Sequence, residues 1–113
     1  MCSKTVLDEI TGKVTQAART ALREKLDKVI LYGSYARDDY DDESDIDIVI
    51  LADIPIEQRW QTYLEISELT GYLGLDFDTI VSIHVIDCAT FYQYINDLPF
   101  YMNVMKDGVV INA

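Results

Sequence analysis

The chain has few cysteines and few basic residues, and each shortage excludes a class of protein. Its two cysteines, Cys2 and Cys88, form neither a CxxC pair nor a disulfide framework. Nine Lys and Arg residues stand against 20 Asp and Glu, and the formal net charge of −11 repels the phosphate backbone of a long nucleic acid. We therefore expect reduced, passive thiols and no direct binding of long DNA or RNA.

Long hydrophobic runs are missing too. The longest, residues 48–52, is far too short to span a bilayer, and the amino terminus has no basic stretch followed by an apolar run. We expect a cytoplasmic protein that does not contact membranes. Because 50% of the 113 residues are hydrophobic, they can fill one small core, which predicts one domain over residues 1–113 with no room for an acceptor-binding domain.

Hydrophobic spacing predicts an α/β (α+β) fold with a small mixed β-sheet flanked by helices. Apolar residues recur at helical spacing at the amino terminus, whereas β-branched and aromatic runs bounded by glycine are typical of strands. Helices are predicted over residues 5–27, 34–37, 56–70, 90–97 and 100–106. Strands are predicted over residues 28–32, 45–51, 76–86 and 109–111.

Two aspartates begin the second predicted strand. Because strand side chains alternate between faces, Asp45 and Asp47 project from the same face, with Cα atoms roughly 7 Å apart at about 3.3 Å per residue. Two carboxylates this close repel each other unless a cation lies between them, and Mg²⁺ accepts one or two carboxylates together with phosphate oxygens and water. A metal site is therefore predicted here, although a DxD pattern alone fits a solvent-facing strand edge as well.

A glycine-serine turn precedes this strand by ten residues. Gly33 allows a tight turn, and a helix that begins at Ser34 presents unpaired N–H groups and a hydroxyl where a triphosphate could rest. Arg37 is the nearest side-chain cation. The acidic run 38–43 between the two motifs lacks the central Gly, the terminal Glu and the following helix of an EF-hand calcium loop, which favours a solvated loop that attracts metal ions.

The sequences LYGSYAR at residues 31–37 and SDID at residues 44–47 resemble the minimal nucleotidyltransferase (MNT) branch of the DNA polymerase β-like nucleotidyltransferase superfamily. The order of elements extends the resemblance over nearly the whole chain. It implies an Mg²⁺-dependent enzyme that transfers AMP from ATP to a hydroxyl, with the nucleotide held by Gly33, Ser34 and Arg37. Relatives commonly carry Gly where this chain has Asp38, so the activity could be lower.

The resemblance also implies the roles of the carboxylates. Asp45 and Asp47 would bind two Mg²⁺ ions on the nucleotide. Members of the superfamily use a third carboxylate on a neighbouring strand, and Asp78 is the candidate, with Asp76 as runner-up because it shares the same predicted strand face. Asp78 would help to hold one ion and accept the proton of the attacking hydroxyl.

The MNT branch implies a partner as well. Its members act as antitoxins that attach AMP to a tyrosine of a HEPN-domain ribonuclease toxin. Two alternatives stay open: a non-catalytic antitoxin that masks the toxin by contact, and an enzyme for small molecules that resembles the aminoglycoside nucleotidyltransferases, which carry an additional substrate domain.

Other candidate residues give weaker signals. His84 has no Cys, His or Ser partner at a suggestive spacing, which favours a packed or surface histidine over a catalytic one. An aromatic set near the carboxy terminus is equally compatible with a core and with an interface. Its members are Phe91, Tyr92, Tyr94, Phe100 and Tyr101.

Overall fold

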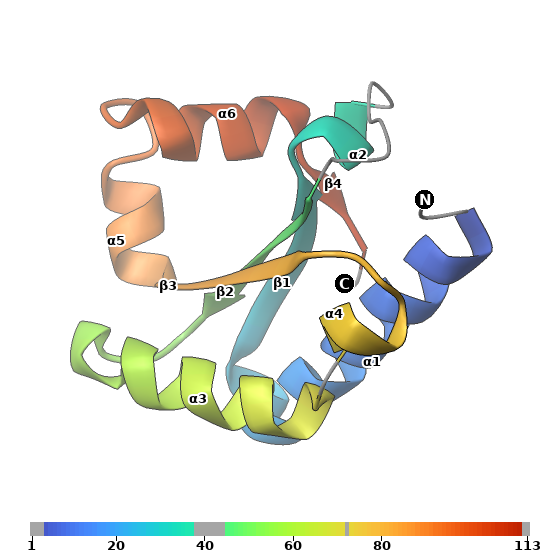
Figure 1. The fold of residues 1–113 in the computed structure, drawn as a ribbon. Coiled ribbons are helices and arrows are strands. Elements are labelled where there is room, and N and C mark those ends of the chain that lie inside the picture. Colours follow the sequence, from blue (N-terminus) through green and yellow to red (C-terminus); the bar gives the residue numbers. More distant parts are fainter. Residues whose placement is uncertain (1–3, 38–44, 72, 112–113) are drawn as a thin grey trace.

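The computed structural model describes residues 4–37, 45–71 and 73–111, and a four-stranded sheet runs through its centre (Figure 1). The strand order is β3-β2-β1-β4. Strand β1 is antiparallel to both β2 and β4, whereas β3 is parallel to β2, so the predicted mixed sheet is confirmed. The strands span Leu26–Tyr32 (β1), Ile46–Ala52 (β2), Val81–Asp87 (β3) and Val109–Val110 (β4).

Helices cover both faces of the sheet (Figure 1). Helices α1 (Lys4–Leu22) and α3 (Arg59–Thr70) pack on one face, and α5 (Cys88–Gln93) and α6 (Pro99–Asp107) on the other. Two short helices, α2 (Ser34–Arg37) and α4 (Leu73–Asp76), follow β1 and α3, and 3-10 turns at Arg23–Lys25 and Ile56–Gln58 precede β1 and α3. No helix within the described residues combines the length and the apolarity needed to cross a membrane.

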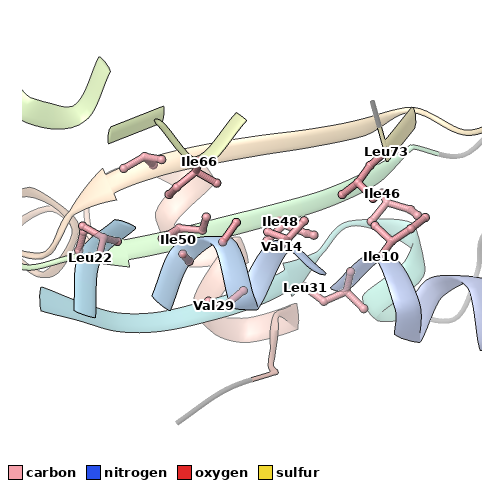
Figure 2. Packing of buried hydrophobic residues seen from close by; sticks show 14 of the residues in the cluster. Ile10, Val14, Leu22, Val29, Leu31, Ile46, Ile48, Ile50, Ile66 and Leu73 are labelled. Carbon is pink, nitrogen blue, oxygen red and sulfur yellow. The ribbon is translucent and has the colours of Figure 1, made fainter. Parts of the chain in front are cut away.

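The core has two layers because the β2 side chains alternate between the faces of the sheet. On one face, Ile46, Ile48 and Ile50 pack against the helix residues Ile10 and Ile66, all without solvent exposure (Figure 2). On the other face, Val49 and Leu51 pack with Phe91, Tyr101 and Val104. Each fully buried side chain of this size contributes about 1.5–3 kcal/mol, so both faces anchor β2.

Several predicted boundaries are wrong. The helix predicted over residues 90–97 begins at Cys88 and ends at Gln93, and the first strand begins at Leu26 instead of Lys28. The helix predicted to end at residue 27 ends at Leu22, because Arg23 has a φ of 54° and the chain then joins the sheet from Leu26 onward. The strand predicted over residues 76–86 begins only at Val81, because pairing with β2 starts there and Ile80 accepts the first hydrogen bond, from Ile46 N at 2.8 Å.

The residues before β3 fold into a helix and a turn. Asp76 ends α4, and Asp78 lies in the following turn with a φ of 51°. Thr79 N donates to Gly74 O at 2.9 Å, which closes the turn and keeps these residues out of the sheet. Asp76 and Asp78 therefore do not share a strand face, contrary to the prediction.

Candidate active site

The antiparallel pairing of β1 and β2 brings the glycine-serine turn to the two aspartates. Tyr32, the last residue of β1, pairs with Asp47, the second residue of β2. Asp45 directly precedes β2, and both carboxylates belong to half-exposed residues at the open end of a strand that is buried from Ile48 onward. Val49 and Leu51 pack toward α5 and α6, so Asp47 faces the same side of the sheet.

Gly33 contacts Asp47 closely. Its φ of 84° lies in the left-handed region, and a Cβ at this position would lie 2.7 Å from Asp47 Oδ2. Ala36 N donates to Gly33 O at 3.1 Å, so the turn leads directly into α2. Glycine is therefore needed twice here, for the backbone conformation and for the space that the carboxylate occupies.

The charge of Asp47 is poorly compensated. Burial raises the pKa of its carboxyl group, and the nearby charge of Asp45 raises it further, whereas His84 lowers it. Among the side chains that the structure describes, no Lys or Arg forms an ion pair with either aspartate. Two neighbouring carboxylates without a cation fit a divalent metal ion that takes its other ligands from phosphate and water.

The third predicted carboxylate, Asp78, does not lie together with Asp45 and Asp47. In the β2–β3 register, Ser82 pairs with Asp47, and His84 lies next along the same face. Asp78 is exposed in the turn before β3. Within the described residues, no group of three Asp, Glu, His or Cys side chains could hold a metal ion.

Aromatic residues that the sequence did not place lie on the same face of the sheet as Asp47. The Phe100 ring lies 5.5 Å from that of Tyr32 and 5.7 Å from that of His84, between centroids. His84 is exposed, as predicted, but it also lies close enough to Asp47 to favour the ionised carboxylate. No local sequence signal identifies these neighbours, since their proximity depends on strand register.

The aromatic residues near the carboxy terminus belong partly to the core and partly to the surface. Phe91 and Tyr101 are buried, whereas Tyr92 and Tyr94 are exposed.

Several predictions fall outside what the structure describes. The backbone of Ser34 and Arg37 lies in α2, but their side chains are not described, and neither are residues 38–44, which include Asp38 and the acidic loop. Their contacts with a nucleotide stay predictions.

Residues 16–111 match the family model described as a nucleotidyltransferase domain. Two proteins of Methanocaldococcus jannaschii, each named "putative protein adenylyltransferase", are similar to the chain. One is 40% identical over 75 residues, which cover 66% of this chain and 73% of the relative. The other is 34% identical over 95 residues, which cover 84% of this chain and 87% of the relative.

Solved structures share the fold. A "putative nucleotidyltransferase" of Sulfolobus solfataricus has a TM-score of 0.58 at 19% identity, covering 96% of this chain and 86% of that chain. A toxin-antitoxin crystallised with AMP-PNP has a TM-score of 0.55 at 20% identity, covering 91% of this chain and 73% of that chain. The match over residues 16–111 and the relative that is 34% identical show that the chain belongs to the nucleotidyltransferase domain family, which confirms the predicted enzyme class.

Proposed function

We propose that this chain transfers AMP from ATP to a tyrosine hydroxyl of a HEPN-domain ribonuclease toxin and thereby acts as its antitoxin. The observation that carries the proposal is the pair Asp45 and Asp47 at the start of β2, with Gly33 packed against the Asp47 carboxylate. The names of the two archaeal relatives support adenylyl transfer to protein, and the fold shared with a toxin-antitoxin supports the biological role.

Each residue of the site has a proposed task. Asp45 and Asp47 would hold Mg²⁺, two ions as the family resemblance implies, while Gly33, Ser34 and Arg37 would hold the phosphates of ATP. Bound there, Mg²⁺ would lower the pKa of the attacking hydroxyl and neutralise charge on the pyrophosphate. A bond forms between the acceptor oxygen and the α-phosphorus, the bond from that phosphorus to pyrophosphate breaks, and the hydroxyl proton passes to a base.

Asp78 is the predicted base and the predicted third ligand. Its place in the turn before β3, away from the position opposite Asp47 that Ser82 occupies, makes the substitution Asp78→Asn informative. If the turn stays as it is, the variant will lose less than about tenfold in rate, because a general base contributes about 10²–10⁴-fold only when it reaches the proton. A loss of several orders of magnitude would instead show that Asp78 moves to the reacting hydroxyl.

The proposed modification has a physical route to antitoxin action. An AMP unit adds a phosphate to the toxin, and a negative charge close to an RNA-cutting site repels the phosphates of the substrate. We propose that the reaction takes place in the cytoplasm, where ATP is supplied.

The test combines this chain, labelled ATP, Mg²⁺ and the purified product of the neighbouring gene, followed by mass analysis of both proteins. We expect the partner to gain one or more AMP units on tyrosine, and the gain to need Mg²⁺. Asp45→Asn and Asp47→Asn should each lower the rate by about a thousandfold, a loss similar to that on removing one electrostatic catalytic group. If the partner gains no mass with the wild-type chain, adenylyl transfer to that protein is refuted.

A binding antitoxin without catalysis is the second candidate. It is favoured by the absence of a third metal-ligating side chain around Asp45 and Asp47 within the described residues. In that case the Asn variants would still protect cells from the toxin, and the toxin would carry no AMP. Loss of both protection and AMP transfer in the same variants would support the enzyme.

A further inference from the structure

Strand β3 lies at an edge of the sheet. It pairs with β2 on one side, and in the part of the chain that the structure describes no strand pairs with its other side. Figure 1 shows α3 on one side of this strand and α5 and α6 on the other, so the helices flank the edge.

The register shows which backbone groups the edge offers. Ile80 O accepts a hydrogen bond from Ile46 N, and alternate residues of a parallel strand bond to the same neighbour. The even-numbered residues Ser82 and His84 therefore face β2, whereas Ile83 and Val85 direct their N–H and C=O groups toward the free edge. Such an edge is a template for one more strand.

An open groove of about 510 Å³ follows this edge. Ile83 and Val85 line it together with Trp60 and Tyr63 of α3, whose rings stack at 5.4 Å with an interplanar angle of 21°. Trp60 is 67% exposed, and large exposed aromatic side chains are typical anchors of interfaces.

Arg59 and His84 supply polar groups to the lining of the groove. Arg59 Nε donates to Asp87 Oδ1 at 2.6 Å, whereas its Nη2 is buried and has no hydrogen-bond partner among the described residues. The Arg59 side chain is 28% exposed and positively charged, so a carbonyl or carboxylate oxygen that enters the groove would be stabilised by its accessible N–H groups. In the β2–β3 register His84 lies on the same face of the sheet as Asp47, and the two side chains interact electrostatically.

The charges of the chain favour a protein in this groove. No carboxylate belongs to the described residues that line it, although the whole chain carries a net charge of −11. A partner would thus cover the groove without burying an unpaired acidic group, and a basic partner would be attracted from a distance.

We propose that the polypeptide carrying the acceptor hydroxyl binds in extended form along the free edge of β3. Its backbone pairs with Ile83 and Val85, an apolar side chain packs on Trp60, and an oxygen accepts from Arg59. The strand then passes His84 and reaches the face on which Asp47 lies. This docking mode rests on the proposed function, since it identifies how the protein acceptor is held.

Amide hydrogen exchange tests the backbone pairing. The complete chain, labelled with ¹⁵N, is measured alone and with the purified product of the neighbouring gene as the probe. We expect exchange at Ile83 and Val85 to slow by about tenfold or more on binding. Ser82 and His84 are internal controls, because their N–H groups already donate to β2 and should change little.

A variant pair on one helix tests the side-chain contact. Trp60→Ala should raise the KM for the probe by about tenfold, as loss of an aromatic anchor does, while kcat and the KM for ATP stay within about twofold. Leu64→Ala is the matched control, because Leu64 is also on α3 and 47% exposed but does not line the groove. The thermal midpoint of each variant shows that it is folded.

The outcomes separate the two proposals. AMP transfer to the probe without slower exchange at Ile83 and Val85 overturns the docking mode alone. Slower exchange without AMP transfer upholds the docking mode and refutes AMP transfer to the probe. If exchange at both residues is already slow in the free chain and slows further as the concentration of the chain rises, a second copy of the chain occupies the edge. That result also overturns the proposal. If the probe neither binds nor gains AMP, both fail.

Discussion

Replacing Gly33 with alanine tests the contact between the turn and the carboxylate at the level of one atom. The φ of 84° makes any side chain costly, by about 1–2 kcal/mol for a left-handed residue. In a domain of this size that cost lowers the Tm by roughly 4–12 °C. Gly33→Ala should therefore fold with reduced stability.

The substitution should lower the rate of AMP transfer by more than the loss of stability can explain. The new Cβ would lie 2.7 Å from Asp47 Oδ2, whereas ordinary contacts begin at 3.4 Å, so the carboxylate must move by 0.7 Å (3.4 − 2.7). A displacement approaching 1 Å lowers rates by up to about 100-fold. We expect kcat for AMP transfer to fall by about 10–100-fold at a temperature where the variant is fully folded.

Gly71→Ala is the control for the backbone cost. Gly71 also has a positive φ, of 66°, but a Cβ there meets no atom within 4 Å. It should lose stability and keep its kcat within about twofold, because it disturbs no group of the site. Initial rates with labelled ATP and thermal unfolding of both variants provide the comparison. If Gly33→Ala transfers AMP as fast as Gly71→Ala, the close approach of Gly33 to Asp47 has no part in the reaction.

Three further predictions concern single carboxyl or thiol groups. Burial raises the pKa of Asp47, so its ionised form destabilises the fold once the pH exceeds the ordinary pKa of 3.8. Asp47→Asn should therefore raise the Tm in metal-free buffer at pH 7. Equal Tm values for the variant and the wild-type chain would contradict the burial argument. Burial also acts to raise the pKa of Asp87, but hydrogen bonds from Thr90 and Arg59 outweigh it and lower that pKa. Asp87→Ala should thus cost about 1 kcal/mol at pH 7 in urea unfolding, and the difference should shrink as the pH falls through the lowered pKa of Asp87. Burial, reinforced by Asp27, raises the pKa of Cys88 to about 11, so iodoacetamide should label Cys88 slowly at pH 8 in a Cys2→Ser variant, and rapid labelling would show that the thiol is more accessible.

Local patterns were enough for the elements that carry the two aspartates. The alternation of Asp45, Asp47 and the apolar run after them predicted a strand with one open end, and β2 has this form. The turn at Gly33 followed from the glycine-serine pair after a β-rich run, because a positive φ is a local steric property. Helical spacing of apolar residues identified α1 and α3, because this pattern too is local, although the predicted ends differ from those in the structure.

Long-range pairing decided what lies around those aspartates. The antiparallel register placed Tyr32 beside Asp47, and the parallel register placed Ser82 and His84 there instead of Asp78. The sequence has β-forming residues on both sides of Val81, so composition alone could not fix where β3 begins. Its start depends on where β2 supplies hydrogen-bond partners, which is a property of two segments together.

The sequence by itself therefore determined the strand that carries Asp45 and Asp47 and the glycine turn before it, since residue type and spacing along one strand or turn are local. That these residues bind a metal ion and a nucleotide stays a prediction. The tertiary structure alone decided that β3 is the edge strand of the described sheet, that Trp60 and Arg59 line a groove with it, and that His84 of this lining shares a sheet face with Asp47. Strand order and register come from the packing of both sheet faces against helices distant in the sequence, and no local pattern encodes them.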